Sequence, residues 1–281
     1  MKITLVRSMS RSAVFELVND SCYRAPAPYT VTLDGAAVCS GDTNVFSLYS
    51  LEPAHTYTLA VTLDGVTDTL TFTTAEESFF VDASRYGLVA DGVTDNTAKL
   101  QAALSTCPAG GTVYLPAGTY RTQSLFLQSN TTLYLEKGCT LLGGTDRRDY
   151  PILPGVLPCH NEKDEQYLAL WEGNPLDSFA ALINVINAEN VTITGEGTLD
   201  CNAQNGDWYQ NPKQKKIAWR PRLFFTSGAK NVVLHGVLAC NSYSWTIHPT
   251  YSENVDILNI RIRNSSQSPN TDGIDPESCK N

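Results

Sequence analysis

Segments that begin with asparagine recur along the second part of the chain and limit most strongly how it can fold. They are NTTLYLEKGCTLLGG from Asn130, NVTITGEGTLDCN from Asn190, NVVLHGVLACNSYSW from Asn231 and NVDILNIRIRNSS from Asn254, and Asn281 stands where a further copy would open. Repeats of about 20 to 30 residues that carry short alternating strands are typical of solenoids. Because no repeat contains a full helix, the pattern predicts a parallel β-helix rather than a leucine-rich repeat. We expect each asparagine to stack its amide on that of the next coil.

A helix is expected directly before the repeats, in DGVTDNTAKLQAALSTCP. Asp95 or Asn96 can cap its N-terminus, and the helix carries Leu100 and Leu104 on an apolar stripe before it ends ahead of Pro108. Solenoids need caps over their open ends. We therefore predict that the helix Asn96–Thr106 covers the N-terminal end of the solenoid.

The first part of the chain differs in composition and predicts a small β-sandwich. Two Asp-Gly pairs, Asp34-Gly35 and Asp64-Gly65, stand between alternating runs, which is a strong hairpin signal. The stretch LEPAHTY resembles the corner of fibronectin type III domains, in which the leucine (here Leu51) enters the core and the tyrosine (Tyr57) bonds to a nearby backbone group. Any other antiparallel sandwich is the alternative. A polar joint, AEES, leads to a division into residues 1–78 and residues 79–281.

Charge and hydropathy exclude several classes of protein. The net charge is -9, which argues against a nucleic-acid partner, and no run approaches the roughly 18 apolar residues that cross a membrane. No signal peptide is recognisable, so we expect a cytoplasmic protein, or a secreted or periplasmic one whose leader was removed. The eight cysteines are scattered without a CxxC pair and are interpreted as buried free thiols rather than as disulfides or a zinc site.

A few side chains are candidates for chemistry on the solenoid. The run KQKKIAWRPRLFF contains Arg220 and Arg222, whose guanidinium groups can bind carboxylates with two bonds. Trp245 offers a face on which a sugar can stack, and His248 follows on the same stretch. The alternatives are a solvated charge run and a structural histidine. The Gly144–Ala180 insertion, which breaks the repeat, is either part of a binding face or a surface decoration.

The last motif, NTDG, contains the best candidate for a catalytic carboxylate, Asp272, although most such strings are only turns. Asp275 follows three residues later. In an extended segment this odd separation sends the two side chains to opposite faces, so they are not expected to act as a pair. Glycoside hydrolysis needs two carboxylates, and the residues by themselves offer one.

Taken together, WEGNPLDSFAALI, NVTITGEGTLDCN, RPRLFF, SWTIHP and SPNTDGIDPESCKN resemble glycoside hydrolase family 28, the polygalacturonases, and most closely its bacterial exo-acting members. The opening GLVADGVTDNTAKLQAAL resembles the cap of the pectin-lyase-like superfamily. The resemblance implies a right-handed parallel β-helix, inverting hydrolysis of α-1,4-galacturonosyl bonds in pectin-derived oligogalacturonides, and neither metal nor cofactor. It implies that Asp272 activates water and that Asn270 supports the sugar at the −1 subsite. Arg220, Arg222 and His248 lie in matching segments as candidate substrate-binding residues.

The sequence also departs from the pattern of that family. An Asp-Asp pair, a Gly-His-Gly and an Arg-x-Lys follow in the family, whereas this sequence ends nine residues after Asp272. We therefore expect an incomplete β-helix that lacks the general acid and does not hydrolyse pectin by itself. The alternatives are a pectate lyase or rhamnogalacturonan hydrolase on the same scaffold, or a non-catalytic carbohydrate-binding protein.

Overall fold

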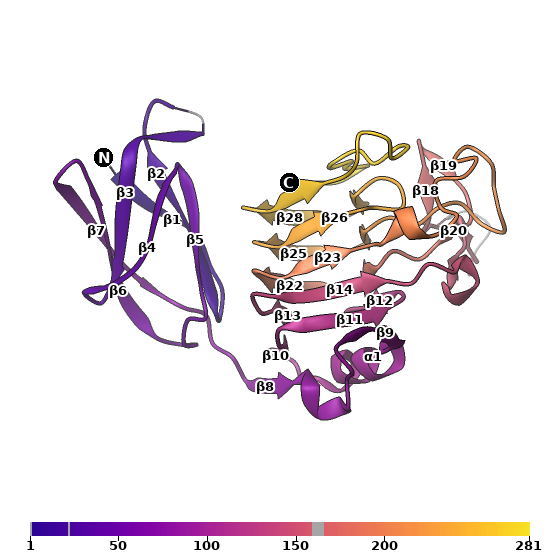
Figure 1. Cartoon of the computed structure of the whole chain (residues 1–281), viewed down its shortest axis with the longest axis horizontal. Coiled ribbons are helices and arrows are strands. Elements are labelled where there is room, and N and C mark those ends of the chain that lie inside the picture. Colours follow the sequence, from indigo (N-terminus) through magenta and orange to yellow (C-terminus); the bar gives the residue numbers. More distant parts are fainter. Residues whose placement is uncertain (1, 22, 159–165) are drawn as a thin grey trace. The chain divides into compact units, whose positions relative to one another are not determined.

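The structure is a computed structural model that describes residues 2–21, 23–158 and 166–281. The chain divides into two compact units, Met1–Ser78 and Phe79–Asn281 (Figure 1). Nearly all of the regular structure is β-strand, so the expected all-β class is confirmed. Within the described ranges no helix is long and apolar enough to cross a membrane.

The first unit is a sandwich of two antiparallel sheets. A three-stranded sheet has the order β1-β2-β5 and a four-stranded sheet the order β4-β3-β6-β7. Their bounds are β1 Lys2–Ser8, β2 Ser12–Val18, β3 Arg24–Leu33, β4 Ala36–Thr43, β5 Val45–Tyr49, β6 Thr56–Leu63 and β7 Val66–Thr73. Both expected Asp-Gly turns are present, since Asp34, Gly35, Asp64 and Gly65 all have positive φ.

The expected corner of the sandwich is formed by LEPAHTY. Leu51 is 5% exposed and belongs to the core, and the backbone N–H of Glu52 donates to the Tyr57 hydroxyl at 2.9 Å. These two features are confirmed. The assignment of the unit to the fibronectin type III class stays a prediction.

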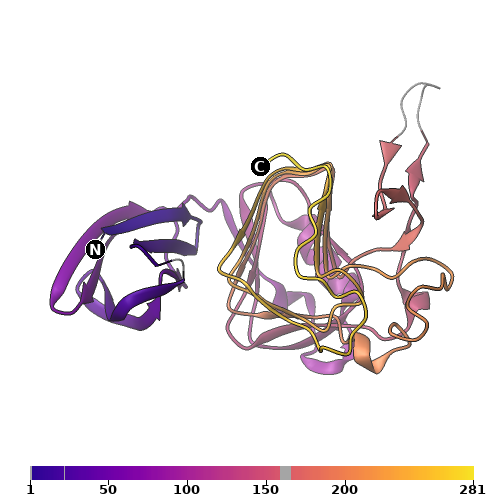
Figure 2. The same ribbon diagram turned by 90° about the horizontal axis from the view of Figure 1, so that it is seen from above.

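The second unit is a solenoid of three parallel sheets, whose coils lie over one another in Figure 2. The first sheet contains β8 Phe79–Asp82, β10 Gly111–Leu115, β13 Thr131–Leu135, β22 Glu189–Gly195, β25 Lys230–His235 and β28 Glu253–Leu258. The second contains β9 Asp91–Asp95, β11 Gly118–Thr122, β14 Cys139–Gly143, β23 Thr198–Asp200, β26 Leu238–Cys240 and β29 Arg261–Arg263. The third contains β12 Leu125–Phe126, β21 Ile183–Ile186, β24 Phe224–Ser227 and β27 Ile247–Thr250. The predicted parallel β-helix is confirmed.

The repeating asparagines form a continuous ladder along one corner of the solenoid. Each Nδ2 donates to the Oδ1 of the preceding coil, over 2.8 Å from Asn190 to Asn130, 2.9 Å from Asn231 and from Asn254, and 3.3 Å from Asn281. All five have φ between 53° and 64°, a left-handed conformation that asparagine tolerates better than most residues. The predicted stacking of amides is confirmed, and we call these five residues the asparagine ladder.

The helix α1, Thr97–Thr106, lies at the N-terminal end of the stack (Figure 1). Its Leu100, Ala103 and Leu104 are buried in the solenoid core, as expected of a cap. Asp95 rather than Asn96 provides the capping bond, because its Oδ1 accepts from the backbone N–H of Thr97 at 2.8 Å. The Asn96 amide bonds to the backbone of Val89 instead.

The insertion between β14 and β21 forms short antiparallel pairs that cover part of the third sheet. They are β15 Ile152–Leu153 with β20 Ser178–Phe179, β16 Val156–Leu157 with β17 Gln166–Tyr167, and β18 Leu170–Trp171 with β19 Asn174–Pro175. A small apolar core of Leu168, Ala181 and Phe225 attaches these pairs to β24. Three 3₁₀ turns complete the unit: η1 Ala83–Tyr86, η2 Arg147–Asp149 and η3 Ala203–Asn205.

Six cysteines of the described ranges are free thiols, as predicted: Cys39, Cys107, Cys139, Cys201, Cys240 and Cys279. The expectation that they are buried is wrong for Cys39, which is exposed, and for Cys279, which is partly buried. Cys22 and Cys159 lie outside the described residues.

Candidate functional site

The third sheet brings the candidate residues together in successive coils. Arg222 stands two residues before β24, and His248 is paired with Phe225 on the neighbouring strand β27. The next coil continues the sheet, because the backbone N–H of Asp275 donates to the carbonyl of Ile247 at 2.9 Å. Parallel stacking therefore turns three distant sequence positions into neighbours.

Arg222 is 4% exposed and is bonded on every side. Its Nη2 donates to the carbonyl of Leu170 at 2.8 Å, its Nη1 to the carbonyl of Arg220 at 2.8 Å and to Ser244 Oγ at 3.3 Å. Its Nε donates to His248 Nδ1 at 3.2 Å. The residue thus joins the insertion, the solenoid and the imidazole.

Arg220 is equally buried and reaches the segment that contains the NTDG motif. Its Nη1 donates to the carbonyls of Tyr243 at 2.8 Å and Pro269 at 2.9 Å, and its Nη2 donates to Asn270 Oδ1 at 2.7 Å. Its Nε is buried and has no partner in the described part of the chain. Asn270 has φ 56° and is held by this bond directly before Thr271 and Asp272.

Neither guanidinium group forms an ion pair with a carboxylate of the described residues, although Asp275 and Glu277 favour the charge of Arg222 from a greater distance. Where the structure is described, their bonds go to carbonyls, an amide, a hydroxyl and an imidazole. Burial lowers the pKa of Arg220 to about 10, and burial together with the charge of Arg220 lowers the pKa of Arg222 to about 9. Both still bind a proton at neutral pH, and buried charges of this kind favour a nearby anion.

His248 is fully buried and neutral. Burial and the charge of Arg222 lower its pKa to about 3, despite the Glu277 carboxylate at 3.2 Å from Nε2. Since Nδ1 accepts from Arg222, Nε2 carries the hydrogen and donates to Glu277. His248 therefore connects Arg222 to Glu277. With no exposed surface and both nitrogens occupied, it has no atom left for a direct contact with a ligand in this arrangement.

Three indole rings lie beside the arginines. Trp171, on β18 of the insertion, stacks on Trp245 with centroids 5.0 Å apart and lies 5.6 Å from Trp219. The guanidinium carbon of Arg222 is 4.7 Å from the centroids of both Trp171 and Trp245. We call Arg220, Arg222, His248, Trp171 and Trp245 the arginine cluster. Trp245 is partly exposed, and its role as a stacking face for a sugar stays a prediction.

Asp272 and Asp275, in the last coil, differ in exposure and interact electrostatically. Asp272 is exposed and Asp275 is partly buried, which agrees with opposite faces. However, burial and then the negative charge of Asp272 raise the pKa of Asp275, whose Oδ2 is buried without a partner in the described residues. The charge of Asp272 thus acts on Asp275, while the expectation that the two do not work as a catalytic pair stays a prediction.

Other members of the basic run do not join the cluster. Lys215 pairs with Asp177 at 3.8 Å, and Lys216 pairs with Asp207 at 3.2 Å. Trp208 is fully buried and packs against Tyr150 and Tyr243. It is a core residue.

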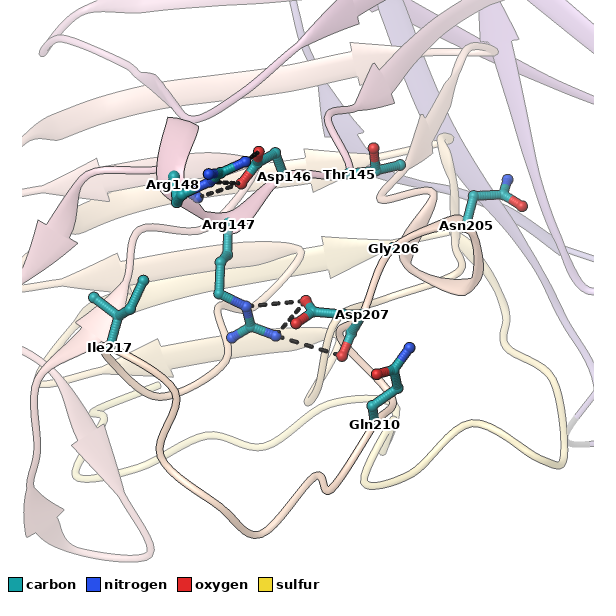
Figure 3. Close-up of a pocket in the computed structure, with 9 residues that line it drawn as sticks. All are labelled: Thr145, Asp146, Arg147, Arg148, Asn205, Gly206, Asp207, Gln210 and Ile217. Atoms are coloured by element: carbon teal, nitrogen blue, oxygen red, sulfur yellow. Dashed lines mark hydrogen bonds and ion pairs between the residues drawn. The ribbon is translucent and has the colours of Figure 1, made fainter.

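A pocket of about 650 Å³ lies beside the start of the insertion, apart from the arginine cluster, and is shown in Figure 3. Its charges pair with one another: Arg147 donates to Asp207 Oδ1 through Nε at 2.9 Å, and Arg148 donates to Asp146 through Nε at 2.9 Å. The guanidinium of Arg147 also covers the Trp208 ring at 4.6 Å. The contacts of Arg147 attach the insertion to the loop that contains Asp207, so the pocket is interpreted as structural.

Sequence reasoning missed two members of the site. Trp171 lies in WEGNPLDSF, and only its stacking on Trp245 shows that it belongs to the cluster. Glu277 lies in DPESCKN, and the signal that could have identified it is the two-residue alternation from Asp275, which places both on one side of an extended segment. No group of three or more His, Cys, Asp and Glu side chains gathers as a metal site among the residues described.

Comparison with known proteins identifies the second unit. Residues 169–281 match the model of glycosyl hydrolases family 28, and residues 80–139 match that of rhamnogalacturonase A/epimerase, pectate lyase-like. The chain carries a family 28 domain. A probable polygalacturonase of Vitis vinifera is 34% identical over 203 residues, which are 70% of this chain and 39% of the grape protein. This chain thus spans well under half of that relative.

Two solved structures resemble this family 28 chain. A family 28 exopolygalacturonase of Yersinia enterocolitica superposes with a TM-score of 0.70 at 21% identity over 98% of this chain and 60% of that one, which shows the fold alone. A hyperthermoactive exopolygalacturonase of Thermotoga maritima gives a TM-score of 0.57 at 30% identity over 71% of this chain and 50% of that one.

Proposed function

We propose that the chain is part of a polygalacturonase-type hydrolase that binds α-1,4-linked galacturonides at the arginine cluster and cleaves them with inversion. The observation that carries this is the pair of buried guanidinium groups, which hydrogen-bond to no carboxylate within the described ranges. A uronic acid supplies the missing negative charge, and the partly exposed Trp245 supplies a face for its ring. Membership of family 28 and the names of its relatives support the substrate class.

In this proposal the exposed Asp272 activates the attacking water, and Asn270, in a left-handed backbone conformation, supports the sugar at the −1 subsite. The proposal also includes exo action. The insertion packs on β24 through Leu168 and Phe225, so it obstructs the outer face of the third sheet on one side of the cluster. A sugar chain would then reach the arginine cluster with its end, because the insertion keeps it from lying across the third sheet.

We further propose that these 281 residues by themselves bind the substrate without cleaving it. Inversion uses two carboxylates on opposite sides of the bond, about 6.5 to 9.5 Å apart. Asp275, the carboxylate that interacts with Asp272, is partly buried with Oδ2 enclosed, so it is badly placed to protonate a leaving group.

Calorimetry with unesterified trigalacturonate, run beside a reducing-end assay, tests the proposal. We expect binding without product, about tenfold weaker binding in Arg220→Met, and stronger binding in Asp272→Asn because a repelling charge is removed. Lys213→Met is the matched control, since Lys213 is an exposed cation of the same run. Absence of binding would refute the substrate class, and turnover would refute only the inactivity.

A further inference from the structure

A second set of left-handed residues borders a pocket at the far end of the third sheet. Directly after β21, β24 and β27 come Asn187 at φ 50°, Gly228 at φ 60° and Tyr251 at φ 44°. Their backbone N–H groups bond across coils, Asn187 to the carbonyl of Ser227 at 2.8 Å and Gly228 to that of Thr250 at 3.3 Å. We call these three residues the pocket column.

The pocket column has a notch at its centre. A Cβ atom on Gly228 would lie 2.5 Å from Asn187 Oδ1, so any side chain there would displace the amide. On the other side of the notch stands Tyr251, which is 44% exposed. A tyrosine with positive φ is strained, and such strain gathers at ligand-binding positions.

The opposite wall belongs to the insertion and is held in place. Leu157, Gln166 and Tyr167 of the β16–β17 pair face the pocket column across a hollow of about 410 Å³. Leu168, which also lines the pocket, is 6% exposed and packs on Phe225 of β24. The volume falls within the range of small-ligand pockets, which is roughly 300 to 1,000 Å³.

The chemistry of the lining differs from that of the arginine cluster. Amide, hydroxyl and phenol groups alternate with apolar carbon, and none of the described lining residues is charged. Tyr251 follows His248 by three positions, which is ~10 Å along an extended strand. The pocket therefore lies within one or two sugar units of the cluster, but offers a uronate no cation.

We propose that this pocket binds an uncharged pyranose ring, which stacks on Tyr251 and exchanges hydrogen bonds with the Asn187 amide in the notch above Gly228. The ring is either a neutral sugar or a methyl-esterified galacturonate unit, since both lack charge and present the same hydroxyl-rich edge. The inference needs only binding and goes beyond the proposed hydrolysis.

Calorimetric titration of the 281-residue chain distinguishes the two sources and tests the site. The probes are a neutral galacto-oligosaccharide, a fully methyl-esterified trigalacturonate and the unesterified trigalacturonate. Tyr251→Asn removes the ring but suits the left-handed backbone, and Gly228→Asn fills the notch with a residue of the same tolerance. Tyr23→Asn, at a tyrosine 65% exposed in the first unit, is the matched control.

We expect one or both uncharged probes to bind, and Tyr251→Asn and Gly228→Asn to weaken that binding about tenfold, as loss of an aromatic contact would. Tyr251→Phe and the Tyr23 control should bind as the parent does. Whichever uncharged probe binds identifies the source. Failure of both to bind, or equal binding by all variants, overturns the proposal. Binding of the unesterified probe reports on the arginine cluster and leaves this result independent.

Discussion

Two columns of left-handed residues run three positions apart through the same turns of the solenoid, and they differ in composition. The asparagine ladder repeats one residue and satisfies each amide with the next. The pocket column changes at every coil, from Asn187 to Gly228 to Tyr251. A uniform corner is the solution that stability alone favours, because asparagine combines a tolerated φ with a bond to each neighbour. We infer that the varied corner, beside the arginine cluster, reflects a role in recognition.

The largest expected effect of a single substitution is at the arginine cluster. Arg222→Met keeps the volume but leaves the carbonyl of Leu170 and His248 Nδ1 without a donor, so we expect the free energy of unfolding to fall by about 3 kcal/mol. Urea denaturation measures it. Arg148→Met, at a side chain 77% exposed, should leave the free energy of unfolding nearly unchanged. Equal losses in the two variants would show that Arg222 contributes no more to stability than an exposed arginine does.

Acid should destabilise the solenoid through two buried histidines, one on the first sheet and one on the third. Burial lowers the pKa of His235, on β25, to about 4, and that of His248, on β27, to about 3. Between about pH 6.5 and pH 4 only the unfolded state binds these protons. The free energy of unfolding therefore decreases as the pH is lowered, by roughly 1.4 kcal/mol per pH unit for each histidine. Denaturation at pH 7, 6 and 5 checks this. His235→Gln should remove about half of the slope, and an unchanged slope would contradict the prediction.

The asparagine ladder should respond more weakly. Asn231→Ala places a residue that has a Cβ but no polar side chain in the left-handed region. It also breaks one exposed and one partly buried hydrogen bond, so we expect the free energy of unfolding to fall by about 1.5 kcal/mol. Asn231→Gly keeps the backbone freedom and separates the two causes. If glycine costs as much as alanine, the amide bonds rather than φ hold the corner.

The smallest effect has the opposite sign. Tyr251→Asn converts a position of the pocket column into the residue of the asparagine ladder, and relief of strain should raise the free energy of unfolding by about 0.5 to 1 kcal/mol. Thermal unfolding should shift upward by about 2 to 4 °C. A lower melting temperature would mean that the Tyr251 ring, although 44% exposed, contributes more through contacts than its backbone costs.

The regular parts of the molecule could be predicted because their signals are local. Alternation gave the strands, the spacing of asparagines gave the coils, and Leu100 and Leu104 gave the capping helix. The asparagine ladder follows from repetition alone. Asp-Gly pairs gave the turns of the sandwich for the same reason, since each turn is decided by two adjacent residues.

The site could be predicted only in part, because its geometry depends on how coils stack. Arg220, Arg222 and Asn270 do come together, but the sequence could not show that the arginines are buried or that His248 is enclosed between Arg222 and Glu277. Nor could it show Trp171, which reaches the site from an insertion with no repeat to fix its register. The effect of Asp272 on the pKa of Asp275 depends on burial and on the separation of the two charges, which alternation does not reveal.

The bond from Arg222 to the carbonyl of Leu170 joins positions 52 residues apart. Since that carbonyl belongs to the insertion, exchanging this segment between related enzymes is not a matter of matching its two ends. A grafted loop would also have to present an acceptor to the guanidinium, or bring a new residue in place of the arginine. Changes in the length of the insertion are therefore coupled to the identity of residue 222, which lies in the following coil of the solenoid.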